Sequence, residues 1–203
     1  MDFNTDMALR SMAAGVPERM IFVGVDLGKL EAHSAIVVVE RVEEMPTNYV
    51  DVLRGVGVRV RFIVRYAERL ALDTDYTFVV RRVKQLVGQL LTRGSCVVVV
   101  DETGVGVPVV EEMRRAGIGC GLHPVKISGG RQATAKSVPR EELLGKLKMM
   151  GEWGELELAV ECGDGEKLRR ELVYLQLGSR RGKGGEKDDL AFALALACWK
   201  ARR

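Results

Sequence analysis

Two apolar runs that each end at an aspartate constrain the fold of this chain more than any other feature. Residues 20–25 read MIFVGV and lead to Asp26, and residues 96–100 read CVVVV and lead to Asp101. Short, continuously apolar runs rich in β-branched residues predict strands that are buried on both faces. If these two strands run as parallel neighbours, their carboxylates lie side by side at one edge of the sheet.

The segments between and around these runs predict one mixed sheet. Residues 34–41 predict a second strand, and the short turn before it favours an antiparallel hairpin with the first. Residues 56–66 alternate, with valines and a phenylalanine on one face and mostly arginines on the other, as in a third strand. A helical pattern over residues 74–92 separates this strand from the fourth, which favours a right-handed crossover and a parallel pair. Residues 119–127 predict a fifth strand.

The remaining segments predict helices around this sheet. Pro139 is a favourable first helical position, and Asp188 opens a final helix that is almost wholly apolar and therefore buried. Residues 1–19 lack periodicity and are expected to form an N-terminal arm, which leaves residues 20–203 as one domain. The predicted fold class is α/β, with a mixed five-stranded sheet of three antiparallel strands followed by parallel strands, flanked by helices.

Composition excludes several classes of protein. The chain of 203 residues is 47% hydrophobic and 29% charged, which is typical of a soluble globular domain. No apolar run approaches the roughly 20 residues that cross a bilayer, and the N-terminus does not resemble a secretory signal, so we expect no membrane partner and a cytoplasmic location. The four widely spaced cysteines and two histidines predict buried thiols rather than a zinc site or disulfides.

Acidic residues supply the main candidate for chemistry. Asp26 and Asp101 end two strands, and the pair Asp188–Asp189 opens a helix that must pack on the sheet. Carboxylates brought together in this way repel each other unless a cation neutralises them, and oxygen donors without His or Cys suit Mg²⁺ or Mn²⁺. Two such ions, roughly 3.5–4 Å apart, can activate a water and stabilise the leaving oxygen in phosphodiester cleavage. Helix geometry alone does not decide between Asp188 and Asp189.

Four segments carry a family resemblance in their order and spacing. They are VGVDLG at 23–28, VVVDETGVG at 98–106, VPREELLGKLKMMGEWGELELA at 138–159 and KDDLAFALALA at 187–197. Over roughly residues 20–200, the chain resembles the nuclease domain of the large terminase subunit of tailed bacteriophages. The resemblance implies an RNase H-like fold, closest to the branch of the Holliday-junction resolvases.

The resemblance also implies roles for the acidic residues. Asp26 and Asp101 would be the first and second metal ligands, and Asp189 would be the ligand from the last helix, so that these three are the expected catalytic residues. Asp188 would assist in metal binding or cap the helix, and Glu102 is a possible outer-shell group. The implied activity is a metal-dependent endonuclease that cleaves DNA with two Mg²⁺ or Mn²⁺ ions. A Holliday-junction-resolvase-type nuclease and a non-catalytic nucleic-acid-binding relative are the alternatives.

The chain departs from a full large terminase in one respect. It contains no G-x-x-x-x-G-K-[ST] phosphate loop, which the ATPase motor of such a subunit requires. We therefore do not expect this chain alone to translocate DNA, and a separate ATPase or packaging component is a candidate partner.

Basic residues predict where DNA would lie. The glycine-rich segment before Asp188 carries Arg180, Arg181, Lys183 and Lys187, and the third strand carries Arg59 and Arg61 as a second candidate. No row of aromatic residues accompanies either group, so base stacking is not indicated. Contact with the phosphate backbone, largely independent of sequence, is the expected mode.

Overall fold

The structure is a computed structural model that describes residues 19–28, 32–45, 53, 57–129, 134, 137–159, 161–176 and 188–203. The predicted arm lies outside these residues except for Arg19, and so does the basic segment that holds Arg180, Arg181, Lys183 and Lys187. The strands are β1 (Met20–Asp26), β2 (Ala35–Glu44), β3 (Arg59–Arg69), β4 (Ser95–Asp101), β5 (Gly121–Ser128), β6 (Ser137–Pro139) and β7 (Leu156–Leu158). The helices are α3 (Tyr76–Leu90), α4 (Gly106–Ala116), α5 (Arg140–Glu152), α6 (Gly165–Gln176) and α7 (Asp189–Ala201).

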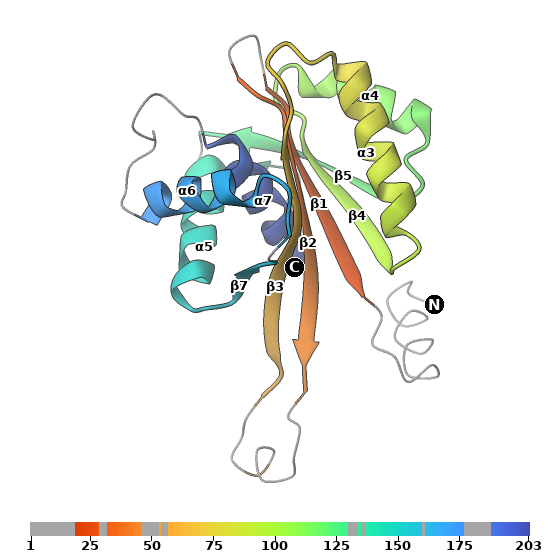
Figure 1. Cartoon of the computed structure of the whole chain (residues 1–203). Coiled ribbons are helices and arrows are strands. Elements are labelled where there is room, and N and C mark those ends of the chain that lie inside the picture. Colours follow the sequence, from red (N-terminus) through yellow and green to blue (C-terminus); the bar gives the residue numbers. More distant parts are fainter. Residues whose placement is uncertain are drawn as a thin grey trace.

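The strands form one sheet in the order β6-β5-β4-β1-β2-β3-β7 (Figure 1). β1 runs antiparallel to β2 and parallel to β4, β2 runs antiparallel to β3, and β5 runs parallel to β4. The predicted arrangement of three antiparallel strands followed by parallel strands is therefore confirmed. The sheet has seven strands rather than five, because β6 and β7 extend its two edges. Each of them is only three residues long, too short for alternation to reveal it in the sequence.

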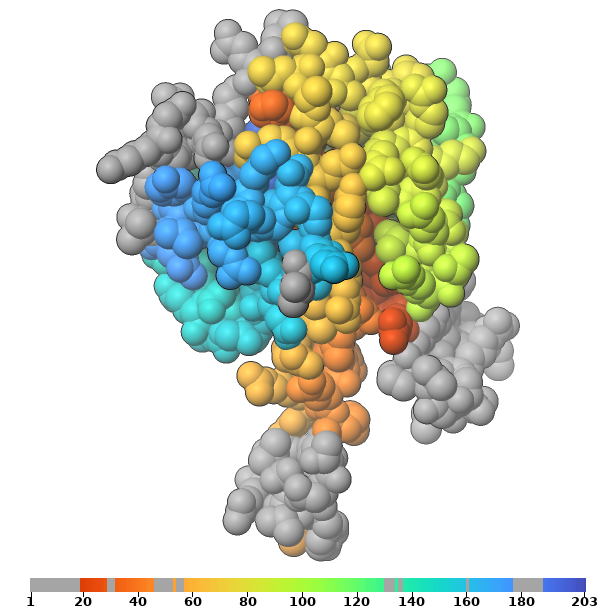
Figure 2. Space-filling view, in the orientation of Figure 1, coloured from red at the N-terminus to blue at the C-terminus, as the bar shows by residue number. Residues whose placement is uncertain are grey.

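Helices cover both faces of the sheet. One face carries α7 with α5 and α6 around it, and the other carries α3 and α4 (Figure 1). In the space-filling view the two helical layers lie on either side of β3, which forms the surface between them (Figure 2). The side chains of β1 divide between the two cores: Phe22 packs on the α7 side, and Val23 and Val25 pack on the side of α3 and α4. The continuously apolar runs thus belong to strands that are buried on both faces, as predicted.

Gly24 brings α7 into close contact with β1. A Cβ atom built on Gly24 would lie 1.9 Å from the carbonyl oxygen of Ala193 and 3.0 Å from the backbone nitrogen of Ala197. Only a residue without a side chain allows the helix backbone to approach the strand this closely. This contact fixes the distance between α7 and the sheet. Asp189 lies about one turn before Ala193 on the same helix, so the contact also brings Asp189 close to β1.

The structure describes all four cysteines of the chain. Cys96, Cys162 and Cys198 are buried free thiols, as predicted, but Cys120 keeps part of its surface exposed because it lies in the turn before β5 rather than inside a strand. Among the helices of the described residues, none is both long enough and apolar enough to cross a membrane.

Candidate active site at the ends of β1 and β4

The two strand-terminal aspartates leave neighbouring parallel strands at the same edge. Val25 of β1 is paired with Val100 of β4, so Asp26 and Asp101 are the next residues on adjacent strands. Alternation along β1 places Phe22 and Gly24 on the α7 face, and Asp26 follows in the same phase. On β4, Val99 packs on the α7 face, and Asp101 follows it two residues later. Both carboxylates therefore belong to the face of the sheet that α7 covers.

Asp26 lies in the middle of the acidic cluster. It keeps some accessible surface at the edge of the sheet, yet burial raises its pKa well above the ordinary value. The negative charges of Asp189, Asp101 and Asp188 add to this rise, and the positive charge of Arg140 partly opposes it. The other three predicted acids therefore lie within electrostatic reach of Asp26.

Asp189 is the buried member of the acidic pair. Asp189 is only 5% exposed, and its Oδ2 atom has no hydrogen-bond partner among the described residues. Burial raises the pKa of Asp189 and the charge of Asp188 adds to it, whereas the charges of Arg69 and His33 and a hydrogen bond with the His33 backbone lower it. A buried carboxylate oxygen without a partner is costly, and a bound cation would satisfy it.

Asp188 has a different environment from its neighbour. Its Oδ1 atom accepts a hydrogen bond of 2.7 Å from the guanidinium of Arg140, at the start of α5. The same guanidinium lies 4.1 Å from the centre of the Phe192 ring. The structure thus separates the two aspartates, which the sequence pattern could not do. Asp188 is ion-paired, and one oxygen of Asp189 has no partner in the described ranges of the chain.

The turn after β4 orients the third carboxylate. The backbone N–H of Thr103 donates to Oδ1 of Asp101 at 2.7 Å, and the Thr103 hydroxyl accepts from the backbone of Ile127 at 2.8 Å. The backbone N–H of Glu102 donates to the carbonyl of Val125 at 3.0 Å. These bonds connect the turn to β5 and give the Asp101 side chain a defined direction.

Glu171 is a fifth acid beside the cluster, and no sequence motif predicted its presence there. It is 5% exposed on α6, accepts a hydrogen bond of 2.8 Å from the backbone N–H of Ala191 and forms an ion pair with Arg69. Burial raises its pKa to about 7, with Asp189 and Asp188 acting in the same direction and Ala191 and Arg69 opposing. One feature of the sequence could have indicated Glu171. It stands three residues after Leu168 on the apolar side of α6, where a charged residue is unusual.

The donor set fits a hard cation. Asp26, Asp101 and Asp189 offer only carboxylate oxygens, and one oxygen of Asp189 is buried with no partner among the described side chains and backbone. A divalent ion would also relieve the repulsion of Asp26 by the other two carboxylates. Within the described residues, no group of three or more His, Cys, Asp and Glu side chains is arranged to hold a metal ion as it stands.

Of the predicted DNA-binding residues, the structure describes only Arg59 and Arg61. Arg59 is exposed at the beginning of β3. Arg61 forms ion pairs with Glu44 and, at 2.6 Å, with Glu157. The positive charge of Arg61 is therefore largely compensated by acids on the neighbouring strands, because β2 and β7 place glutamates on both sides of it.

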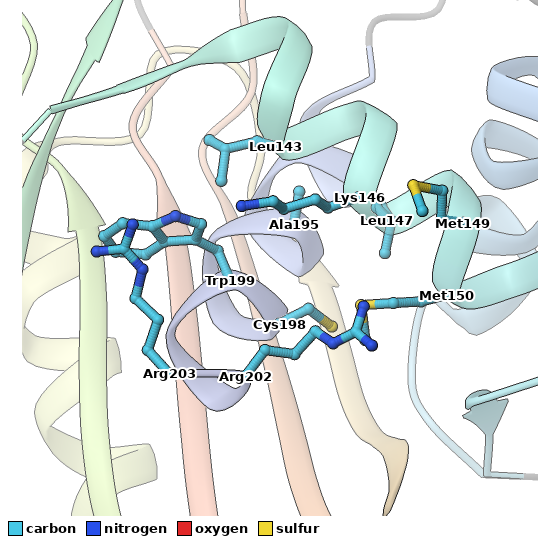
Figure 3. A pocket seen from close by; sticks show the side chains of 10 residues that line it. All are labelled: Leu143, Lys146, Leu147, Met149, Met150, Ala195, Cys198, Trp199, Arg202 and Arg203. Carbon is cyan, nitrogen blue, oxygen red and sulfur yellow. The ribbon is translucent and has the colours of Figure 1, made fainter. Parts of the chain in front are cut away.

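A separate cavity of about 290 Å³ lies between α5 and the C-terminal half of α7 (Figure 3). Its lining is mostly apolar, with Lys146, Arg202 and Arg203 among the side chains around it. Lys146 pairs with Glu142 at 2.6 Å, and Arg202 pairs with Glu155 at 3.1 Å. The cavity lies at the opposite end of α7 from Asp189, so it does not belong to the acidic cluster.

No protein-family model and no curated protein matches the sequence. The fold is similar to the large terminase nuclease from the thermophilic phage G20c, solved with bound zinc, with a TM-score of 0.52 and 22% identity over 90% of this chain and 81% of that chain. It is also similar to the nuclease domain of the large terminase subunit gp2 of bacterial virus Sf6, solved with manganese and beta-thujaplicinol, with a TM-score of 0.50 and 13% identity over 92% of this chain and 91% of that chain. The chain thus adopts the RNase H-like α/β fold of large terminase nuclease domains, which its motifs predicted.

Proposed function

We propose that this protein is a metal-dependent endonuclease that hydrolyses DNA phosphodiester bonds with two divalent ions. One observation carries the proposal: Asp26, Asp101 and Asp189 come from two strands and a helix to one edge of the sheet, and a buried oxygen of Asp189 has no partner within the part of the chain that the structure describes. The fold adds support, because the two solved structures described above, which it resembles, are terminase nucleases.

In this proposal, Asp26, Asp101 and Asp189 bind the ions, which are Mg²⁺ or Mn²⁺. Asp188 remains bound to Arg140 and fixes the beginning of α7 rather than coordinating directly. When bound, the ions would supply activation of a water and charge stabilisation of the departing oxygen. The protein's own contribution is to hold three carboxylates in fixed directions, through the strand ends, the Thr103 hydrogen bond and the first turn of α7.

The segment directly before Asp188 is proposed to hold the DNA backbone. It carries Arg180, Arg181, Lys183 and Lys187, and it directly precedes Asp188 and Asp189 in the sequence. Arg59 and Arg61 are the weaker candidate, because Arg61 already pairs with two glutamates. Binding through phosphates would make DNA recognition largely independent of sequence. A separate ATPase or packaging component is the proposed partner for any role in DNA packaging.

Incubation of the protein with supercoiled plasmid in Mg²⁺, in Mn²⁺ and in EDTA tests the proposal. We expect nicking and linearisation with either ion and none in EDTA, and we expect Asp26→Asn and Asp101→Asn to abolish cleavage. Glu111→Gln is the control, because Glu111 is an exposed acid that pairs with Arg114 on α4, outside the cluster. Cleavage that persists in EDTA would exclude the two-ion mechanism. Binding of DNA without cleavage in either metal would favour the non-catalytic alternative.

A further inference from the structure

The first turn of α7 receives its helix cap from another helix. Asp188 occupies the N-cap position, but its side chain forms no capping hydrogen bond and binds Arg140 instead. The N–H groups of a first helical turn need an acceptor from outside the helix. Glu171 of α6 supplies one, because its Oε2 atom accepts from the backbone N–H of Ala191 at 2.8 Å. Ala191 is the third residue of α7, where an N-cap side chain would normally act.

Arg69 of β3 holds the Glu171 carboxylate in place. Its guanidinium binds Oε1 of Glu171, and the two side chains are only 11% and 4% exposed. The backbone N–H of Arg69 also donates to Asp164 at 2.8 Å, just before α6 begins. Both oxygens of Glu171 are therefore occupied, one by a side chain of the sheet and one by the backbone of α7. A carboxylate used in this way connects two elements of the fold.

The placement of this carboxylate is electrostatically unfavourable. Asp188 and Asp189 both repel Glu171, and its burial removes it from water. Asp188 already occupies the usual position for a helix cap, so capping alone would not require a second buried acid beside Asp189. Instead, Asp188 binds Arg140, and the hydrogen bond between Glu171 and Ala191 holds the backbone two residues after Asp189.

We infer that Glu171 and Arg69 are a positioning pair, which fixes the first turn of α7 so that the Asp189 carboxylate points at Asp26 and Asp101. The inference deepens the proposed function and rests on it for the role of Asp189. Neither Glu171 nor Arg69 touches the ions or the DNA in this assignment. They act through the backbone of α7, as residues behind a metal ligand commonly do.

Three variants and one matched control separate positioning from charge. Glu171→Asp keeps the negative charge but shortens the side chain by one methylene. Glu171→Gln keeps the length but removes the charge and one of the two acceptor oxygens, so it cannot serve both Ala191 and Arg69. Arg69→Lys keeps the positive charge but cannot make the same guanidinium contact. The control is Glu68→Gln, since Glu68 is the neighbour of Arg69 on β3 and pairs with Arg82 of α3 on the opposite face of the sheet.

The first measurement is amide hydrogen exchange in the first turn of α7, residues 189–192, without metal. Loss of a helix cap predicts exchange about 10-fold faster in Glu171→Asp, Glu171→Gln and Arg69→Lys, and unchanged in Glu68→Gln. Circular dichroism tests whether each variant is folded. If a Glu171 variant does not fold, hydrogen exchange in Arg69→Lys tests the positioning role instead. Unchanged exchange in the folded variants overturns the inference, whatever the protein does with metal.

The second measurement is the Mn²⁺ dissociation constant by calorimetry. Positioning predicts about 10-fold weaker binding in both Glu171 variants, whereas an effect of charge alone predicts a loss in Glu171→Gln but not in Glu171→Asp. Faster exchange with unchanged Mn²⁺ affinity would overturn the positioning of Asp189. A wild-type protein that neither binds Mn²⁺ nor cleaves DNA would overturn the proposed function, and hydrogen exchange would still decide whether the pair holds α7.

Discussion

The charge of Asp189 raises the pKa of Asp26 more than any other neighbouring charge does, ahead of that of Asp101. The first strand and the last helix therefore meet at their acidic residues, although they lie near opposite ends of the chain. Gly24 makes this possible, because it allows α7 to approach β1 to backbone contact two residues before Asp26. The acidic cluster is thus a product of how the last helix docks on the sheet.

Neutralising Asp26 is expected to stabilise the metal-free protein while removing its activity. Asp26→Asn relieves both the burial of a charge and its repulsion by Asp101 and Asp189. We expect the melting temperature in EDTA to rise by about 2–4 °C for each kcal/mol of repulsion removed. Differential scanning calorimetry measures this, with Glu111→Gln as the control. A lower melting temperature for folded Asp26→Asn would contradict the repulsion.

The two members of the acidic pair are expected to differ in activity. Asp189→Asn should reduce cleavage by about 100-fold or more, since it alters an oxygen donor for the ions. Asp188→Asn should have a much smaller effect, because an amide oxygen can still accept the hydrogen bond from Arg140. Single-turnover cleavage of a labelled duplex measures both. Equal losses, or a larger loss for Asp188→Asn, would show that Asp188 is the ligand.

Gly24→Ala is expected to be strongly destabilising. The new methyl group would lie 1.9 Å from a backbone oxygen of α7, so the helix would have to move away from the sheet. We expect a loss of about 3 kcal/mol or more in the free energy of unfolding, measured by urea titration. Gly88→Ala is the matched control, because Gly88 lies within α3 and a methyl group there meets nothing within 4 Å. That change should be neutral or stabilising by up to about 1 kcal/mol, and similar effects at the two glycines would exclude the close contact.

The metal-free protein is expected to lose stability as the pH rises from about 5 to about 8. Burial raises the pKa of Glu171 from 4.5 to about 7, so the folded state holds its proton more tightly than the unfolded state does. This contribution is fully present below the unfolded pKa and is lost as the pH passes the folded pKa. It amounts to at most about 3 kcal/mol, and the raised pKa values of Asp26 and Asp189 act in the same direction. Glu171→Gln should flatten the dependence of melting temperature on pH in EDTA, and an unchanged slope would argue against a raised Glu171 pKa.

The basic segment before α7 is expected to bind DNA phosphates. Changing Arg180, Arg181 and Lys183 together to glutamine should weaken binding about equally for all duplex sequences. It should also reduce the slope of log affinity against log salt concentration by roughly 0.9 for each lost phosphate contact. Mn²⁺ affinity should not change, because no proposed ligand is altered. Binding isotherms at several salt concentrations test this. An unchanged slope would indicate that DNA binds at Arg59 and Arg61 instead.

The order and type of the main elements followed from the sequence, because each strand and helix has a local pattern. Continuous β-branched runs predicted β1 and β4, a twofold alternation predicted β3, and a nearly uncharged helix predicted a buried α7. The two strand-terminal aspartates could be placed at one edge for the same reason, since parallel neighbours end together. The short strands β6 and β7 were missed, because three residues show no period.

Only the tertiary structure separated Asp188 from Asp189 and brought Glu171 into the site. Asp188 meets Arg140, which opens another helix, and Glu171 meets a strand residue on one side and the backbone of α7 on the other. Likewise, Arg61 belonged to a predicted basic face of β3, yet pairing with β2 and β7 surrounds it with glutamates. A sequence pattern indicates which positions of a helix or strand are buried and with what period they recur. The partner that a buried or charged group finds depends on elements far away in the chain, and only their packing decides it.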